Sequence, residues 1–565
     1  MTGDQSARQG WLFGPGVDLL LGCGGAYIAI FALLVVAGDR MLALIPLGLL
    51  PLLTLFTGTP HVGATLLRVY ERGEDRSRYA LVSLWATALV GAAFVLGVYD
   101  LRIGSWLITA YLAWSPWHFT AQNYGIAMMF MKRRGVEVTA GVKRLVFWSF
   151  TFSWILVFLS MNGDAASTLY APYGPDGIAY RFISLGLPLA INVPLLAIAL
   201  LGYVVCLAGA ALVLLRRASW RALGPSALLL LVQALWFSFP VVARNLGLFT
   251  DLVPISRQHA EYSLLWIMFG HSVQYLWITT FFAFRSGAES RGLPYLTKSL
   301  LAGGAIWGVP LLLFGPDLFG ARAVDAGLFL LVAAAVNVHH FILDGVIWRL
   351  RSGRIAGILL RDREESLASF NAAPRRRSWI RPLVWAAGAL YAVLTIVGTL
   401  EIEFGIRRAD PTDVIRLRSA AERLRLIGRD HPQVRYNLGV LAMQAGELET
   451  GRSELERSLS LGPTADAWAA LGLLHEERGR AEDARAAYDA ALALDPHNVL
   501  ALFQSALLRR AAGDHERAER ELARAETAQR RVVARRPEEP GAEQRLRQIL
   551  AVRADQDEAR PRGDP

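Results

Sequence analysis

The sequence predicts an all-α protein in two parts, a polytopic membrane helix bundle at residues 1–405 and a soluble helical-repeat domain at 406–535. Hydrophobic residues make up 54% of the 565 positions and charged residues only 19%, less charge than a soluble protein of this length usually carries. Up to about residue 405, long apolar stretches alternate with short basic loops. Beyond it no apolar run is long enough to span a bilayer, and a pattern recurs about every 33–34 residues. We expect the charged, proline-containing segment 536–565 to be partly disordered.

The first part contains a series of membrane-spanning helices. A hydrocarbon core needs about 20 apolar residues of helix, and about eleven stretches come close to that length. They lie near 14–37, 41–60, 79–98, 104–130, 144–162, 189–215, 224–246, 261–284, 297–315, 323–348 and 380–400. Pro116 interrupts the fourth stretch and predicts a kink there.

Basic residues in the loops predict the orientation of these spans. Lys and Arg gather after the second, fourth, sixth and tenth spans, whereas intervening loops such as 163–180 are poor in them. The positive-inside rule then places the N-terminus in the cytoplasm. We expect the chain to be a multi-pass protein of the bacterial inner (cytoplasmic) membrane. With eleven spans the repeat domain is periplasmic, and one span more or fewer would reverse its side. Because topology accounts for the net charge of +10 and no nucleic-acid-reading motif is found, we expect no nucleic-acid partner.

The second part contains a repeated helical motif. The residues that recur are Tyr436-Asn437-Leu438-Gly439 with Gly446, then Trp468-Ala469-Ala470-Leu471-Gly472 with Gly479, Ala484, Ala487, Tyr488, Ala490 and Leu494-Asp495-Pro496, and more weakly Gly513 and Ala518. This pattern resembles the tetratricopeptide repeat (TPR) family over roughly 430–530. The resemblance implies helix pairs stacked into an α-solenoid with a surface that binds a protein or peptide partner. We expect 412–427 to cap the stack, and a passive spacer is the alternative.

Polar residues inside the predicted spans form four groups that contain five histidines. The groups are Thr59-Pro60-His61 with Thr65 and Arg68; Trp117-His118 with Gln122 and Tyr124; His271 with Gln274 and Tyr275; and Asn337, His339, His340 and Asp344. Ionisable side chains are costly in a bilayer, so each group is a functional hypothesis. A four-residue spacing places His118 with Gln122, and His340 with Asp344, on one helix face. A carboxylate one turn from an imidazole can accept its ring N–H, as it does around metal sites.

The predicted topology brings these histidines to a similar depth. The spans that carry His118, His271 and His339-His340 all run from outside to inside, and His61 lies at the cytoplasmic end of its span. A helix bundle can gather such groups around one site. We therefore expect His61, His118, His271, His339, His340 and Asp344 to be metal ligands. Iron best fits imidazoles with a carboxylate, zinc and copper also bind imidazoles, and haem is an alternative.

Two readings without a metal remain open for these groups. One is a polar cavity that handles substrate or protons, and the other is hydrogen bonding between helices. The patterns His118-x-x-x-Gln122, His271-x-x-Gln274-Tyr275 and His339-His340-x-x-x-Asp344-Gly345 resemble motifs of uncharacterised bacterial multi-pass membrane proteins, which implies no activity. Membrane fatty-acid desaturases are more distant, since their His-x-x-His-His boxes are absent here. Carotene-cleaving dioxygenases are similar only in having histidines dispersed over several spans.

The pattern favours a metal-dependent membrane oxidoreductase that acts on a lipid or isoprenoid. Metal would activate dioxygen or water, while Gln122, Gln274 and Tyr275 would act as catalytic residues that position the substrate. Whether the chain is an enzyme stays open, because a membrane-anchored TPR scaffold or assembly factor of the cell envelope is the first alternative. A transporter and a lipid-linked glycosyltransferase are further alternatives. The short first external loop, 38–40, argues against the glycosyltransferase.

Overall fold

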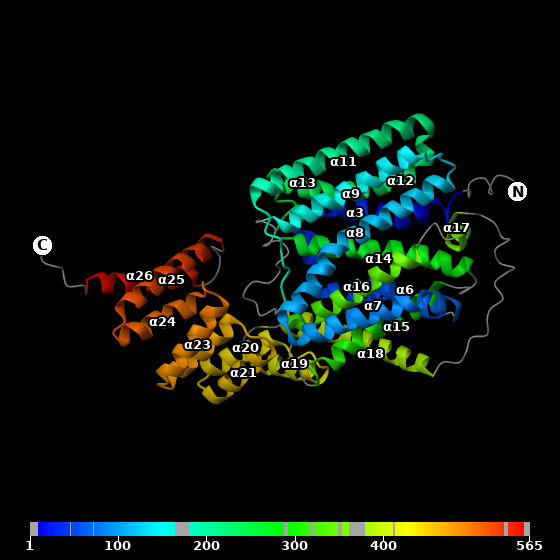
Figure 1. The fold of residues 1–565 in the computed structure, drawn as a ribbon. Coiled ribbons are helices and arrows are strands. Elements are labelled where there is room, and N and C mark those ends of the chain that lie inside the picture. Colours follow the sequence, from blue (N-terminus) through cyan, green and yellow to red (C-terminus); the bar gives the residue numbers. More distant parts are fainter. Residues whose placement is uncertain are drawn as a thin grey trace. The chain divides into compact units, whose positions relative to one another are not determined.

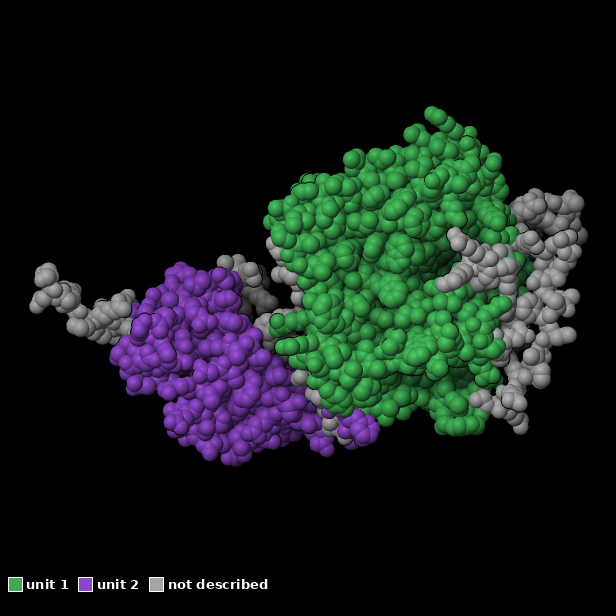
Figure 2. Space-filling model, in the orientation of Figure 1, with its two compact units in different colours: residues 1–172, 180–314, 328–403 green, residues 173–179, 315–327, 404–565 purple. Residues whose placement is uncertain are grey.

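The computed structural model describes most of the chain as helix. The described residues are 10–45, 47–71, 73–163, 180–286, 292–315, 318–320, 323–348, 353–360, 379–408, 410, 413–535 and 541–558. Within these ranges no β-strand occurs, which confirms the all-α prediction. The loops 164–179 and 361–378, on which part of the orientation argument depends, lie outside the described residues. The chain forms two compact units (Figure 2).

The first unit comprises residues 1–172, 180–314 and 328–403. Its long helices lie side by side (Figure 1). In chain order the helices are α2 (Pro15–Val17), η1 (Asp18–Gly22), α3 (Gly25–Ala37), α4 (Asp39–Leu44), η2 (Leu47–Leu49), α5 (Leu50–Phe56), α6 (Gly58–Tyr70), α7 (Gly73–Tyr99), α8 (Leu101–Arg133), α9 (Ala140–Asn162), α11 (Leu189–Arg217), α12 (Trp220–Gln233), η3 (Ala234–Ser238), α13 (Phe239–Asn245), α14 (Ala260–Arg285), α15 (Gly292–Leu313), α16 (Phe329–Ile347), α17 (Gly353–Leu360) and α18 (Ile380–Leu400).

Eight helices of the described residues are long and apolar enough to cross a membrane. A ninth candidate is the pair Pro15–Gly22 and Gly25–Ala37, which is bent by 56°. The remaining two expected spans are α8 and α14, which are helices of 33 and 26 residues. The polar group around His118 lies on α8 and that around His271 lies on α14. Neither helix is among the eight that are apolar enough to cross a membrane. The count of eleven spans therefore stays a prediction.

The second apolar helix begins later than the sequence pattern indicated. It covers Leu50–Tyr70, whereas 41–60 was expected. Pro51 in the first turn of α5 explains the start, since proline fits the beginning of a helix, where its missing N–H is not needed. His61 consequently lies within the helix, in the first turn of α6, and not at the end of a span.

Small residues bring the backbones of α6, α15 and α18 into direct contact. A Cβ atom on Gly63 would lie 1.8 Å from the Ser299 carbonyl oxygen, and one on Gly303 would lie 1.9 Å from that of Thr59. A Cβ atom on Gly388 would lie 2.0 Å from the Leu301 carbonyl oxygen. Such close approach is typical of helix pairs in membranes. It holds α6, the helix of His61, against α15.

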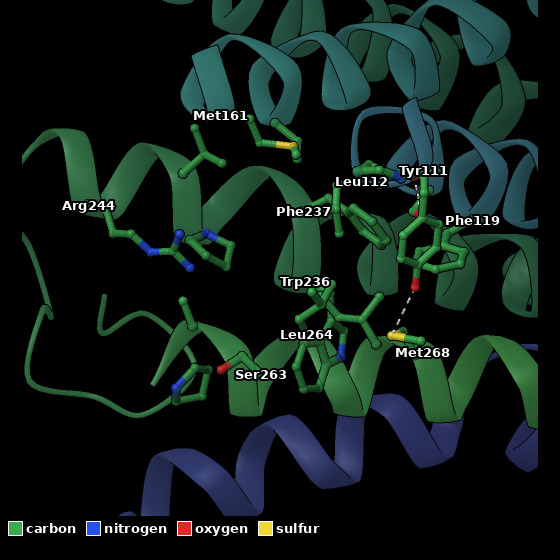
Figure 3. Close-up of a pocket in the computed structure, with 18 residues that line it drawn as sticks. Tyr111, Leu112, Phe119, Met161, Trp236, Phe237, Arg244, Ser263, Leu264 and Met268 are labelled. Atoms are coloured by element: carbon green, nitrogen blue, oxygen red, sulfur yellow. Dashed lines mark hydrogen bonds between the residues drawn. The ribbon is translucent and has the colours of Figure 1, made fainter. Parts of the chain in front are cut away.

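An apolar cavity lies between α8, α9, α13 and α14 (Figure 3). Aromatic and aliphatic side chains form most of its wall, among them Phe119, Val157, Trp236 and Met268. Tyr111 and Phe119 line it from α8, whose helix continues through Pro116.

The second unit comprises 173–179, 315–327 and 404–565. Its helices after η6 (Glu401–Arg407) are α19 (Val414–Leu426), α20 (Pro432–Gln444), α21 (Leu448–Leu461), α22 (Ala465–Glu477), α23 (Ala481–Leu494), α24 (Val499–Ala511), α25 (His515–Arg535) and α26 (Ala542–Glu558). Gly472 lets α22 approach α23, because a Cβ there would lie 2.4 Å from the Tyr488 ring. Gly446 and Gly479 have φ of +78° and +71° after α20 and α22, the left-handed conformation that ends helices.

Both ends of the repeat stack contain packed helices. As expected for a cap, α19 packs on α20 through Leu417, Ala421, Val434 and Leu438. At the other end, α26 occupies much of the segment expected to be partly disordered, and Ile549 packs with Leu502 of α24. Residues 536–540 and 559–565 lie outside the described residues.

A buried arginine holds the first repeat together. Arg435 is 5% exposed, and its guanidinium donates to Asp430 at 2.7 Å, Glu454 at 3.2 Å and Glu422 at 3.4 Å. Burial lowers the pKa of Arg435, and the carboxylates of Asp430 and Glu454 more than offset this effect, so that the pKa is raised. The ion pairs join the α19–α20 connection to α20 and α21.

We expect Arg435→Ala to destabilise the repeat unit locally by about 2 kcal/mol, because it removes three charge-assisted hydrogen bonds and leaves the buried Asp430 with Arg457 as its remaining partner. Hydrogen exchange of peptides from 414–461 in the full-length protein would measure the loss of protection. The matched control is Arg452→Ala, which removes exposed pairs with Glu449 and Glu456 and should change protection little. Equal effects of the two variants would contradict a structural role for the buried network.

Candidate metal centre

Four histidines from four helices meet in the interior of the first unit. One ring nitrogen each from His61, His118, His271 and His340 lies within 4.8 Å of all the others. Their helices are α6, α8, α14 and α16. Three of the four side chains are buried and that of His118 is nearly so. Residues far apart in the sequence thus form one compact group, which we call the histidine cluster.

The rings of the histidine cluster face a common centre. Ring centroids are 4.3 Å apart for His61 and His340, 4.7 Å for His61 and His271, and 4.9 Å for His118 and His271. The Nε2 atoms of His61 and His340 approach to 2.5 Å, which is closer than an ordinary N–H···N hydrogen bond. The two rings thus direct these nitrogens at one another across the centre of the cluster.

Several nitrogens of the cluster have no hydrogen-bond partner. These are Nδ1 of His61, Nε2 of His118 and both ring nitrogens of His271. Buried polar atoms are nearly always paired, so an unpaired group calls for a specific explanation such as an ion. Neutral imidazole nitrogens are ligands for iron, copper and zinc. The donor set therefore fits a metal cation at the centre of the cluster.

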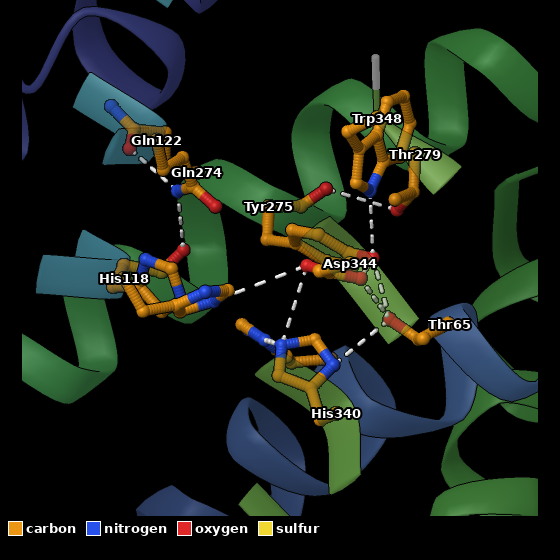
Figure 4. A network of polar contacts seen from close by, with 11 residues as sticks. Thr65, His118, Gln122, Gln274, Tyr275, Thr279, His340, Asp344 and Trp348 are labelled. Carbon is orange, nitrogen blue, oxygen red and sulfur yellow. Dashed lines mark hydrogen bonds and ion pairs between the residues drawn. The ribbon is translucent and has the colours of Figure 1, made fainter. Parts of the chain in front are cut away.

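Thr65 on α6 determines which nitrogen of His340 carries the proton (Figure 4). The Thr65 hydroxyl donates its only hydrogen to Oδ1 of Asp344 over 2.9 Å. The same hydroxyl contacts that of Tyr275 at 2.5 Å, and Tyr275 also donates to Asp344. With both hydroxyl hydrogens directed at Asp344, the Thr65 oxygen is the acceptor for Nδ1 of His340, at 3.0 Å. With the proton on Nδ1, Nε2 of His340 faces the cluster with a free lone pair.

Asp344 connects this hydrogen-bond network to the cluster. Its Oδ1 accepts from Tyr275 at 2.7 Å as well as from Thr65, and Trp348 donates to the Tyr275 oxygen at 3.0 Å. Its Oδ2 lies 3.4 Å from Nε2 of His340 and 3.9 Å from Nε2 of His118. One oxygen is thus held by the network while the other points to the cluster, where it can serve as a further ligand.

His339 lies outside the histidine cluster, although the sequence pattern grouped it with His340. Its Nε2 is 3.0 Å from the Thr87 hydroxyl of α7. Neighbouring residues on an α-helix point about 100° apart, so His339 and His340 cannot both face the same centre. The structure brings together the other four histidines and Asp344, and it places His339 against α7 instead.

The two glutamines link helices beside the cluster. Gln122 donates to Oε1 of Gln274 at 2.6 Å and to the backbone oxygen of His271 at 3.2 Å. Gln274 donates in turn to the backbone oxygen of Gly22 at 2.8 Å. These bonds join α8, α14 and η1, which suits residues that position the ligands. Tyr275 stacks on His61 with centroids 4.3 Å apart.

Apolar rings close the other sides of the cluster. Phe341 stacks on His118 at 4.3 Å, and Phe119 lies 4.4 Å from His271 between ring centroids. These rings cover two of the histidines with apolar surface. The hydrogen bonds that connect His340 through Thr65 to Asp344 were not predicted from the sequence, and neither were the contacts of Trp348 and Phe119. Thr65 is 275 residues along the chain from His340, and Trp348 is 73 residues from Tyr275, so no local spacing indicates such pairs.

Comparison with known families tests only the C-terminal unit. A tetratricopeptide repeat family model matches residues 436–499 and 469–540. The predicted TPR domain is thereby confirmed, and its repeats support a partner-binding or scaffold role for this part of the chain. Neither the curated proteins nor the solved structures gave a significant match.

We expect Thr65→Val to weaken metal binding by about ten- to a hundredfold, the usual loss when a hydrogen bond to a metal-bound histidine is removed. Valine keeps the shape of threonine but cannot accept from Nδ1 of His340. Thr65→Ser is the matched control, since it keeps the hydroxyl and should retain most of the affinity. Competition with a chelator of known affinity measures both variants. Equal losses in the two would show that packing, and not the hydroxyl, is important here.

Proposed function

We propose that the first unit is a membrane-embedded metalloprotein whose single metal ion is held by His61, His118, His271 and His340. The observation that supports this most directly is the set of converging, unpartnered ring nitrogens inside an apolar helix bundle. Structural hydrogen bonding between helices would pair all of these nitrogens, whereas Nδ1 of His61, Nε2 of His118 and both ring nitrogens of His271 have no partner. The contact between Nε2 of His61 and Nε2 of His340 accounts for only two of the ring nitrogens. Eight apolar helices long enough to cross a bilayer support the membrane location.

Iron is the metal we propose for this site. Four imidazoles with a carboxylate oxygen nearby suit iron, whereas zinc and copper are bound as readily by imidazole alone. Haem fits less well. Ring nitrogens from four helices within 4.8 Å of one another have room for an ion among them but not for a porphyrin.

We further propose an oxidoreductase that acts on a lipid or isoprenoid. A bound iron would supply redox chemistry with dioxygen. The protein contributes the ligand geometry, the proton on Nδ1 of His340, the carboxylate of Asp344 and a dry surrounding of aromatic rings. Tyr275 and the two glutamines would act as positioning residues. A site inside a lipid bilayer is accessible to apolar molecules, which supports this substrate class.

The proposed location is a bacterial inner membrane with the N-terminus in the cytoplasm. The bent pair, α8 and α14 complete a count of eleven spans if all of them cross, and the TPR domain is then periplasmic. This topology separates the metal site in the cytoplasmic half from the surface that binds a partner.

Elemental analysis of the full-length protein, purified without oxygen, tests the proposal together with dioxygen uptake. We expect about one iron per chain, an absorption spectrum without haem bands, and dioxygen uptake that requires both iron and an added lipid extract. A protein that binds only zinc would contradict the oxidoreductase proposal. A protein that binds no metal would contradict the metal centre and leave the scaffold function, which the TPR match favours.

A further inference from the structure

The cavity between α8, α9, α13 and α14 has a volume of about 60 Å³. A cavity that holds one water molecule needs a volume of about 10–15 Å³. The space therefore accommodates a diatomic molecule with ease. Its size suits a small molecule.

The polar side chains in the cavity wall are already paired with the protein. Ser115 donates to the backbone oxygen of Tyr111 at 2.7 Å, and Ser263 donates to that of Val253 at 3.2 Å. Trp236 donates to Tyr27 at 3.1 Å, and Nε of Arg244 donates to the Ile255 oxygen at 2.5 Å. A buried water needs about three hydrogen bonds. Apart from the guanidinium of Arg244, which lies at the end of the cavity away from Phe119 (Figure 3), the lining is apolar or has its polar side chains paired, which favours an apolar occupant over water.

The cavity borders the histidine cluster. Phe119 lines the cavity, and its ring lies 4.4 Å from the ring of His271. On α14, Met268 and Ile267 line the cavity about one turn before His271. Tyr111, which lies near Phe119 and Met268 in the cavity wall (Figure 3), stacks on Phe341, and Phe341 stacks on His118. One aromatic ring, that of Phe119, thus separates the cavity from His271, and two rings, those of Tyr111 and Phe341, separate it from His118.

We propose that this cavity binds dioxygen and supplies it to the metal centre, with Phe119 as the gate between them. The inference rests on the proposed function, because it requires a centre that reacts with dioxygen. Dioxygen is small and apolar, and it dissolves better in a lipid phase than in water. A dry cavity beside a centre in the membrane would raise its concentration at the metal.

Xenon binding and the kinetics of oxidation test this proposal on the full-length protein. The probe is xenon gas, which enters dry apolar cavities and whose bound form gives an NMR resonance distinct from xenon in detergent. Val157→Phe fills the cavity from α9, and the milder Val157→Leu fills part of it if the larger ring prevents folding. The matched control is Val205→Phe on α11, where the side chain is exposed on the outside of the bundle.

We expect a bound-xenon resonance in the wild type, a weaker one in Val157→Leu and none in Val157→Phe. Stopped-flow oxidation of the iron(II) protein by dioxygen should be about tenfold slower in Val157→Phe than in Val205→Phe, with equal iron content in both. Absence of bound xenon in the wild type would overturn the proposal, as would equal oxidation rates in a variant that has lost xenon. Failure of the proposed function appears separately as missing iron, while the xenon measurement is independent of metal.

Discussion

His271→Leu is expected to abolish metal binding while it stabilises the metal-free protein. Both ring nitrogens of His271 are buried without a hydrogen-bond partner, so leucine removes two unsatisfied polar atoms and breaks no hydrogen bond of the side chain. Replacing unpaired buried polar groups by apolar ones is neutral or stabilising. Loss of a direct ligand should lower the affinity for metal more than about a hundredfold, the upper range for residues behind the ligands.

The sign of the stability change distinguishes the two interpretations of the cluster. If a metal is bound, the loaded wild type is more stable than loaded His271→Leu, and the order reverses once a chelator removes the metal. Metal content and thermal unfolding in detergent measure both effects. His339→Leu is the matched control, because His339 pairs with Thr87 away from the cluster and its loss should leave metal content unchanged. Full metal content in His271→Leu would exclude this residue as a ligand.

Gly63→Ala is expected to destabilise the bundle by about 1–3 kcal/mol, the usual cost of overpacking, and to weaken metal binding. The added methyl group would lie 1.8 Å from the Ser299 oxygen, so α6 and α15 must move apart. His61 and Thr65 lie on α6 within one turn of Gly63, and both would move with the helix. The expected result is therefore a joint loss of stability and metal affinity.

Gly91→Ala provides the control for this change. Gly91 lies in α7, and a Cβ atom there would meet nothing within 4 Å. Alanine in an open helix position is favoured over glycine by about 0.5–1 kcal/mol, so this variant should be unchanged or slightly more stable. Thermal unfolding and chelator competition measure both variants. If Gly63→Ala behaved like Gly91→Ala, the close contact of α6 with α15 would be refuted.

Much of the candidate site could be predicted because ionisable groups are rare inside apolar helices. His61, His118, His271 and His340 were found by this criterion alone, and the four-residue spacing predicted Asp344 beside His340. The choice between His339 and His340 could not be made from the sequence. Adjacent positions on one helix differ only in the direction they face, and that direction depends on how α16 packs against its neighbours.

Contacts between segments that are far apart in the sequence could not be predicted either. The sequence pattern suggested that Asp344 would accept the ring N–H of His340, whereas Thr65 of α6 takes this position and passes the bond on to Asp344. The cavity beside Phe119 depends on three-dimensional packing in the same way. In the C-terminal unit, by contrast, each repeat contacts its neighbours in sequence, so glycine and alanine spacing was sufficient to predict the TPR fold.

The measurement that tests the metal centre most directly is X-ray absorption at the edge of the metal found in the purified protein. We predict about four nitrogen neighbours near 2.0–2.2 Å, the range of metal–imidazole bonds, with the outer-shell scattering of imidazole rings. In His271→Leu the residual signal should lose one imidazole or vanish. A metal without imidazole neighbours, or a carefully prepared protein with no metal at all, would contradict the four-histidine centre.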